Sequence, residues 1–385
     1  MTVGASAMYA SIVGLYAFAQ EFHISRGEAS LPYTLFMLGF GAGGVAIGRI
    51  SDRVGIFPPV VGSAFALALS LYLSTLANDI FFIALTSGLM AGFLGSAATF
   101  GPLVADISHW FNRRRGIAVA VVISGNYVAG TIWPPILQRL IDQQGWRTTF
   151  TELAVFVVVT MLPLSLMLLR KSPITDDHPA EKIGSPGIDR PGLAPWHLQS
   201  LLCVAGIGCC VAMAMPQVHI VAYAADLGYG ATAGAQMLSL MLGFGIVSRL
   251  GSGWISDKIG GLKTLMLGSA LQGTVLALFL TGNSLFALYL LSALFGLAQG
   301  GIVPSYTIIV RTFFSARDAG WRVGLTMLFT MIGMAFGGWL AGGLYDLTGS
   351  YTMAFVNAIA FNVLNFAIAV FVFRRMGARP AAYAV

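Results

Sequence analysis

Long apolar runs separated by short polar breaks make up most of the chain. Each run is about 20 residues long, which is the length of an α-helix that crosses a bilayer. A transmembrane β-barrel would need alternating segments of roughly 10 residues instead, so the pattern disfavours one. The runs predict twelve helices, at 2–20, 31–50, 59–77, 80–105, 116–139, 149–170, 197–224, 231–254, 262–281, 285–310, 323–345 and 351–373.

The composition points to the same class of protein. Hydrophobic residues make up 57% of the 385 residues and charged residues only 9%, whereas a soluble domain carries about 25% charged residues. These few charged residues cannot cover the surface of a water-soluble protein of this size. Lipid must therefore solvate most of the exterior. We therefore expect an all-α integral membrane protein with twelve transmembrane helices.

The distribution of Lys and Arg predicts the orientation in the membrane. If the helices alternate in direction, 17 of these residues fall on one side, and three, Arg26, Arg139 and Arg147, fall on the other. The positive-inside rule puts the richer side in the cytoplasm. We expect a multi-pass protein of the cell membrane with both termini in the cytoplasm. The net charge of +6 then reflects topology and not nucleic-acid binding.

Short motifs recur at a nearly constant distance along the chain. GRISDRVG at 48–55 matches GWISDKIG at 253–260 with an offset of 205, and DQQG at 142–145 matches DLTG at 346–349 with an offset of 204. An aromatic pair in each half shares an offset of 203. Such agreement indicates a tandem duplication with parallel topology.

The duplication predicts two six-helix halves. The N-terminal half covers 1–170 and the C-terminal half covers 197–385. The segment between them, 171–196, is rich in proline and charge, which is typical of a flexible linker, and we expect it to lie in the cytoplasm.

This organisation resembles the major facilitator superfamily over essentially the whole chain. The G-x-x-x-D-R/K-x-G element lies between the second and third helices of each half. Three further features resemble the monocarboxylate transporters and their bacterial oxalate/formate relatives: Arg249 eight residues before Asp257, the run P-x-x-H-x-x-x-Y-A-x-D-x-G from Pro216 to Gly228, and the loop W-F-x-x-R-R-G after the fourth helix.

The resemblance implies a secondary transporter whose halves rock around a central site. It also implies that the two loop motifs hold the halves together in one conformation and release them in the other. The expected gating residues are Gly48, Asp52, Arg53, Gly55, Gly253, Asp257, Lys258 and Gly260.

Arg249 is the one cation well inside a predicted helix, while all 15 carboxylates lie at predicted helix ends or in loops. A guanidinium in the membrane without a counter-ion costs from about 2.5 to above 10 kcal/mol. An anionic substrate would neutralise it, and the planar guanidinium binds a carboxylate through two parallel hydrogen bonds. The alternative is an arginine that snorkels to the cytoplasmic interface.

Other polar residues in predicted helices are weaker candidates for substrate binding. His219 is the only histidine well inside a predicted helix, and it is either a hydrogen-bonding or proton-linked site residue or a residue of the packed core. Asn126, Tyr127 and Tyr306 lie on helices that border the central cavity in the superfamily. Tyr33 is a further candidate.

Several classes of function lack their sequence signals. There is no phosphate-binding loop, no cluster of metal ligands and no pair of carboxylates suited to hydrolysis. We therefore expect a non-enzyme without cofactor or metal. The expected function is secondary active transport of a small organic anion, most favourably a monocarboxylate, with protons as the candidate coupling ion. The family often has an aspartate four residues before the arginine, but Gly245 stands there, so His219 or the substrate would have to carry a coupled proton.

Three alternatives stay open: an oxalate/formate-type exchanger, a polyspecific drug efflux pump and a non-transporting receptor. A drug pump usually needs a buried carboxylate for its cationic substrate, and a static receptor has no need of two gating motifs. Oxalate-type relatives use a second cation in the eleventh helix, whereas 323–345 holds no Lys, Arg or His. A monoanion is therefore favoured over a dianion. The particular acid, the direction of transport and the oligomeric state stay open.

Overall fold

The computed structural model describes residues 1–110, 115–170 and 193–376, and these ranges contain helices and no strand. Ten helices within them are long and apolar enough to cross a bilayer, so the expected all-helical class is confirmed. The predicted ranges 2–20 and 116–139 are helical as well but are not among these ten, and the number of spans stays a prediction. Most of the expected linker at 171–196 lies outside the described residues.

Within each of two parts of the chain, the helices follow one another closely in sequence. The first part of the chain contains α1 (Ser6–Phe22), α2 (Arg26–Ala29), α3 (Leu31–Val54), α4 (Phe57–Thr75), α5 (Ile80–Thr86), the π-helix η1 (Ser87–Ser96), α6 (Gly101–Trp110), α7 (Arg115–Gln144), α8 (Trp146–Ser165) and the 3₁₀-helix η2 (Leu166–Leu169). The second part contains α9 (Pro195–Asp226), α10 (Ala231–Ile259), α11 (Gly261–Phe279), α12 (Leu285–Gln299), α13 (Ile302–Phe313), α14 (Ala316–Thr348) and α15 (Thr352–Met376).

Two of the predicted helices are interrupted in the structure. The range 80–105 divides into α5, η1 and α6, and the range 285–310 divides into α12 and α13. Close backbone contact accompanies each interruption: a Cβ built on Gly88 would lie 3.0 Å from the Leu35 carbonyl oxygen, and one on Gly300 would lie 2.6 Å from the Gly245 carbonyl oxygen. The spacing of apolar residues along the sequence does not predict these interruptions, because a glycine in close contact with another helix looks the same in the sequence as a glycine that makes no such contact.

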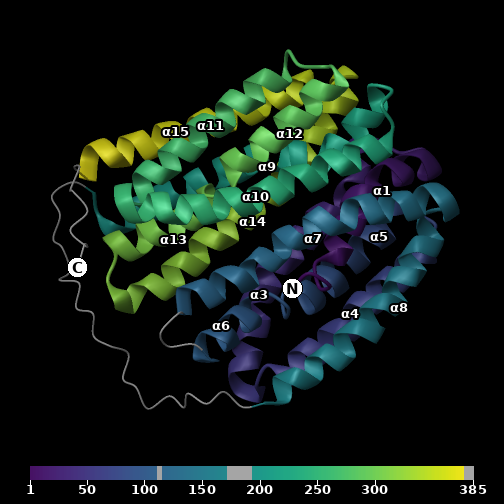
Figure 1. Ribbon diagram of the computed structural model, residues 1–385, viewed down its shortest axis with the longest axis horizontal. Coiled ribbons are helices and arrows are strands. Elements are labelled where there is room, and N and C mark those ends of the chain that lie inside the picture. Colours follow the sequence, from purple (N-terminus) through teal and green to yellow (C-terminus); the bar gives the residue numbers. More distant parts are fainter. Residues whose placement is uncertain (111–114, 171–192, 377–385) are drawn as a thin grey trace.

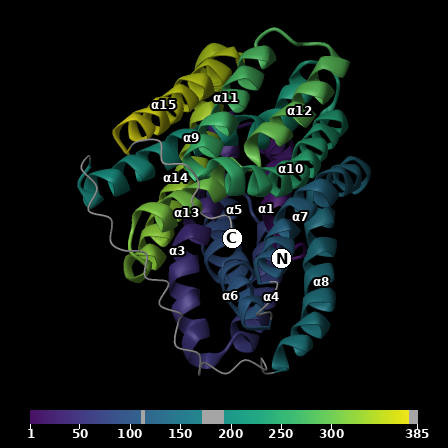
Figure 2. The same ribbon diagram turned by 60° about the vertical axis from the view of Figure 1, so that its left-hand side comes forward.

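The helices form two groups in space. Figures 1 and 2 show α1 to α8, purple to blue, on one side of the molecule and α9 to α15, green to yellow, on the other. The first group has α4 packed on α8, and the second has α11 packed on α15. The most extensive contacts between the groups are made by two pairs of helices, α3 with α14 and α7 with α10, and α2 with α14 and α1 with α9 add smaller ones. We call the first two pairs the α3–α14 seam and the α7–α10 seam.

The α3–α14 seam is packed over the first half of α3 only. Thr34 donates a hydrogen bond across it to the Ala335 carbonyl at 3.3 Å, and a Cβ built on Gly41 would lie 3.2 Å from the nearest atom of α14. Three and seven residues further along α3, a Cβ on Gly44 or Gly48 would meet no described atom within 4 Å. Contact across this seam is therefore lost towards the C-terminal end of α3.

The α7–α10 seam follows the same pattern. Thr232 donates a hydrogen bond to the Asp142 carboxylate at 2.6 Å, and Ser239 donates one to the Thr131 carbonyl. Nearer the C-terminal end of α10, a Cβ on Gly253 would meet no described atom within 4 Å. Both seams are thus closed at one end of the bundle and separate towards the other. We call these ends the Arg26 end and the Asp52 end.

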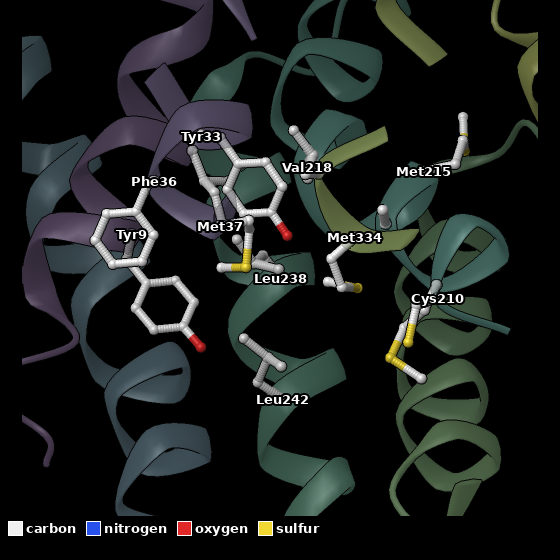
Figure 3. Packing of buried hydrophobic residues seen from close by; sticks show 14 of the residues in the cluster. Tyr9, Tyr33, Phe36, Met37, Cys210, Met215, Val218, Leu238, Leu242 and Met334 are labelled. Carbon is white, nitrogen blue, oxygen red and sulfur yellow. The ribbon is translucent and has the colours of Figure 1, made fainter. Parts of the chain in front are cut away.

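A layer of apolar side chains joins the two groups in the middle of the bundle (Figure 3). Its members belong to one continuous core and come from α1, α3, α9, α10 and α14: Tyr9, Tyr33, Phe36, Met37, Val218, Leu238, Leu242 and Met334. All are buried. Leu242 stands seven residues before Arg249 on α10, so Arg249 lies about 10 Å from this layer, on the side of the Asp52 end.

Candidate functional site

The two copies of the loop motif have the same backbone form. The last glycine of each, Gly55 and Gly260, has a positive φ of 83° and 84°, a conformation that favours glycine. Each donates its N–H at 2.9 Å to the carbonyl of the residue four positions earlier, Ser51 or Ser256, and ends its helix. The glycine that closes the motif is therefore required by the turn.

The charged residues of the two loop motifs do not pair with one another in the described part of this conformation. Asp52, Arg53, Asp257 and Lys258 are all exposed, and among the described residues none of them forms an ion pair. The Lys258 ammonium lies 3.6 Å from the centre of the Trp254 ring in its own motif. Their gating role stays a prediction.

Arg26 joins the two groups at the other end of the bundle. The side chain belongs to α2, and its Nη2 donates to the Asp226 carboxylate of α9 at 2.8 Å. The guanidinium also lies over two aromatic rings, with its Cζ 4.9 Å from the centre of Tyr16 and 5.6 Å from that of Tyr345. Arg26 is only 8% exposed. We call the contacts of Arg26 with Asp226, Tyr16 and Tyr345 the Arg26 clamp. From the sequence, Arg26 served only to predict orientation in the membrane, and these contacts were not predicted.

The repeated D-x-x-G turns reinforce the clamp. Asp346 accepts hydrogen bonds from the backbone N–H groups of Arg26 and Gly27 at 2.7 and 2.8 Å. Asp142 accepts one from the Thr232 hydroxyl at 2.6 Å. Gly27 and Thr232 are themselves 205 positions apart, so each turn binds the first turn of the equivalent helix in the opposite group. The sequence showed the repeat but not this contact.

Arg249 faces the α7–α10 seam. It is half-buried and lies ten residues before the end of α10, about 15 Å along the helix axis. Its Cζ lies 4.6 Å from the centre of the Tyr127 ring of α7. That ring also lies against Gly245, on the Arg26 side of Arg249, so the arginine does not extend towards the Asp52 end as a snorkelling side chain would.

No protein carboxylate neutralises Arg249 among the described residues. Its Nε is buried without a hydrogen-bond partner in the described part of the chain, and the two ion pairs found there involve other residues. The backbone beneath it is held closely, since a Cβ on Gly300, the residue that follows α12, would lie 2.8 Å from the backbone nitrogen of Arg249. Arg249 is thus a firmly placed cation without a described counter-ion.

His219 occupies the core of the second group. It is fully buried, and its Nε2 donates at 2.7 Å to the Gly338 carbonyl of α14. The neutral ring then accepts through Nδ1 from the Tyr351 hydroxyl at 3.2 Å. In this conformation neither ring nitrogen is free for a ligand.

The other predicted site residues do not gather around Arg249. Tyr306 is fully buried and donates to Asn365 at 2.7 Å, and Tyr33 is buried in the apolar layer. The Asn126 backbone carbonyl accepts a hydrogen bond from Tyr9 at 3.2 Å. Of the residues singled out from the sequence, the structure brings only Tyr127 to Arg249.

A second cation lies inside a helix where none was expected. Arg322 precedes the predicted range 323–345, but α14 begins at Ala316 and so includes it. Its Cζ lies 4.2 Å from the centre of the Phe314 ring, and its Nε is buried without a hydrogen-bond partner among the described residues. The predicted helix boundary concealed this residue.

Comparison with known proteins agrees with the fold. The model of the Major Facilitator Superfamily matches residues 1–281 and 201–383. The chain is 29% identical over 327 residues to "Monocarboxylate transporter 13" of Rattus norvegicus, a match that covers 81% of this chain and 72% of that protein. It is 25% identical over 334 residues to "MFS transporter asaE" of Aspergillus flavus, covering 86% of this chain and 74% of that protein.

Solved structures show the same fold. A mutant of the peptide transporter POT in complex with alafosfalin superposes with a TM-score of 0.75 at 14% identity, covering 98% of this chain and 94% of that chain. A bacterial homologue of the human lysosomal transporter Spinster gives a TM-score of 0.73 at 14% identity, with 97% and 94% covered. The chain belongs to the major facilitator superfamily, and it resembles the monocarboxylate transporters within it.

His219 offers a test that separates packing from substrate binding. His219→Gln should lower the melting temperature of the purified protein, because a disrupted buried hydrogen bond costs about 1–3 kcal/mol. The apparent affinity of the folded protein for substrate should not change. His197→Gln is the matched control, since His197 is exposed at the start of α9. Unchanged stability with lost affinity would place His219 at the substrate.

Proposed function

We propose that this protein is a secondary transporter of small organic anions, most favourably monocarboxylates, and that Arg249 binds the carboxylate. The observation that carries the proposal is a guanidinium at the seam between the two groups of helices, with no carboxylate partner among the described residues. Such a cation is costly within a membrane. A substrate carboxylate offsets that cost, and the charges balance one to one.

The surroundings of Arg249 suit a small molecule with an apolar body. The Tyr127 ring lies on one side of the guanidinium, with its centre 4.6 Å from Cζ, and the planar guanidinium can bind a carboxylate through its N–H donors. On the Arg26 side, Leu242 and Met334 belong to the buried apolar layer. The names of the relatives, monocarboxylate transporters 13 and 11, support the same substrate class.

We propose transport by alternating access between two six-helix halves with twelve spans in all. The packing of both seams at the Arg26 end and their separation towards the Asp52 end support this proposal. The excess of Lys and Arg supports an orientation in which the Asp52 end lies on the cytoplasmic side of the cell membrane, and in that orientation this conformation faces inwards. In the opposite conformation the loop motifs would hold the halves together and the Arg26 clamp would open.

The proposal includes possible proton coupling, for which fewer residues are available than for substrate binding. Position 245, four residues before Arg249, is glycine, so the carboxylate that the family often has there is missing. His219 stays the candidate proton carrier, and it would have to exchange its bonds to Gly338 and Tyr351 during the cycle.

One observation favours a second candidate, an exchanger of dicarboxylates such as oxalate. Arg322 lies in α14 with a buried Nε that has no hydrogen-bond partner among the described residues, and it would supply a second positive charge. The two candidates are separated by competition with labelled lactate. A monocarboxylate site should bind oxalate at least tenfold less well than pyruvate, which corresponds to about 1.4 kcal/mol. Oxalate that competes as well as pyruvate would favour the exchanger.

Replacement of Arg249 tests the site itself. Arg249→Ala and Arg249→Lys should both abolish uptake of radiolabelled lactate or pyruvate by proteoliposomes, because alanine removes the charge and lysine lacks the planar pair of donors. Arg375→Ala is the control, since Arg375 lies over Phe371 near the end of α15. Full uptake by folded Arg249→Ala protein would remove the proposal.

The aspartates of the D-x-x-G turns and those of the loop motifs should shift the equilibrium between the two conformations in opposite directions. Gly44→Cys places a thiol in the open part of the α3–α14 seam, where its labelling rate reports opening at the Asp52 end. Asp346→Asn weakens the Arg26 clamp and should lower this rate by roughly fivefold, the equivalent of about 1 kcal/mol. Asp52→Asn weakens the opposite contacts and should not lower it.

Asp79→Asn is the control for this experiment, because Asp79 caps α5 through the Phe82 N–H at 2.9 Å and makes no described contact between the groups. Equal labelling in the Asp346 and Asp52 variants would contradict the proposal that the two sets hold opposite conformations.

A further inference from the structure

Tyr127 and Gly245 fit together across the α7–α10 seam. A Cβ built on Gly245 would lie 2.5 Å from Cε1 and 2.7 Å from Cδ1 of the Tyr127 ring. These distances are far below van der Waals contact, so the ring lies directly on the backbone of α10. Any residue other than glycine at position 245 must displace it.

The same ring holds the guanidinium of Arg249. Gly245 and Arg249 are four residues apart and therefore neighbours on one face of α10. The ring covers the first and lies 4.6 Å from the Cζ of the second. Gly245 thus fixes the position of the ring, and the ring fixes one face of the cation.

This contact determines how an anion can approach. An arginine next to an aromatic ring is attracted through its flat face, whereas a carboxylate binds along the N–H edges. Among the described residues the Arg249 Nε is buried without a hydrogen-bond partner, and its Nη groups make no described hydrogen bond, so no described group competes with an anion for these two groups. The ring occupies one side of the guanidinium, so an anion has to approach the Nη groups from another side.

We infer that Tyr127 is a positioning residue for Arg249 and that Gly245 admits it, so that the two set the affinity of the site for a planar carboxylate. Tyr127 acts through its ring and not through its hydroxyl. This inference rests on the proposed function, because it assigns the residues that prepare Arg249 for the substrate.

The test measures the concentration of pyruvate that half-inhibits uptake of labelled lactate, together with the maximal rate and the melting temperature. Tyr127→Phe keeps the ring and should leave the affinity near that of the wild type. Tyr127→Leu removes the ring and should weaken the affinity roughly tenfold, within the range of a partly buried cation–π contact. Tyr127→Met is the second ring-free variant if the leucine protein does not fold.

Gly245→Ala should also weaken the affinity roughly tenfold, because the methyl group displaces the ring. Gly243→Ala is the matched control on the same helix, since its Cβ would lie at an ordinary 3.5 Å from Thr131. If Gly245 acts through the ring, the double variant Gly245→Ala/Tyr127→Leu should bind as Tyr127→Leu does, and the two effects should not add.

Wild-type affinity in folded Tyr127→Leu or Tyr127→Met protein would overturn the inference, as would additive effects in the double variant. A loss in Tyr127→Phe equal to that in Tyr127→Leu would assign the role to the hydroxyl and contradict it as well. Arg249→Ala is measured alongside. If it transports normally, the proposed function fails; if it is inactive while Tyr127→Leu is normal, only this inference fails.

Discussion

A guanidinium within a membrane-spanning helix, without a carboxylate partner among the described residues, is the constraint on which this account depends. The Arg249 charge has a large cost in a low-dielectric environment, and the chain meets that cost only in part, through the face of the Tyr127 ring. Under the proposed function, a substrate carboxylate supplies the remaining interaction. Gly245 and Gly300 are necessary to this arrangement, because they allow α7 and α12 to approach α10 closely enough to fix both the ring and the backbone beneath the arginine.

The ends of the bundle differ in how their charges are used. At the Arg26 end, Asp226 and Asp346 bind the first turn of α2 across the two groups, while at the Asp52 end the loop motifs stay exposed. These contacts join a nearly buried arginine and its backbone to carboxylates that stay partly exposed, and each contributes on the order of 1–3 kcal/mol. Contacts of this size can close one end without trapping the protein there, which is what a transport cycle requires. The duplication supplies the symmetry, since each D-x-x-G turn meets the equivalent helix of the opposite group.

The sequence predicts the helical class, the course of most helices and the superfamily, because apolar runs and repeated motifs depend only on local residue types. It also singles out Arg249 as a candidate binding residue, since a lone cation in an apolar run is conspicuous. It could not predict the clamp around Arg26, which joins residues about 200 and 320 positions apart. Nor could it show that His219 is bound on both sides by Gly338 and Tyr351. The predicted eleventh helix begins one residue after Arg322, so Arg322 was not counted as a cation within a helix. The sequence also could not show that the Tyr127 ring lies against Gly245.

The most direct test of the central claim compares an acid with its neutral isostere. Lactate and lactamide differ by one charge and have nearly the same shape, so their ratio of affinities isolates the contribution of the carboxylate. The account predicts a strong preference for lactate in the wild-type protein and the loss of that preference in Arg249→Gln, because the guanidinium is the group that distinguishes the two. A preference for lactate that persists unchanged in folded Arg249→Gln protein would show that another group binds the carboxylate and would contradict the account.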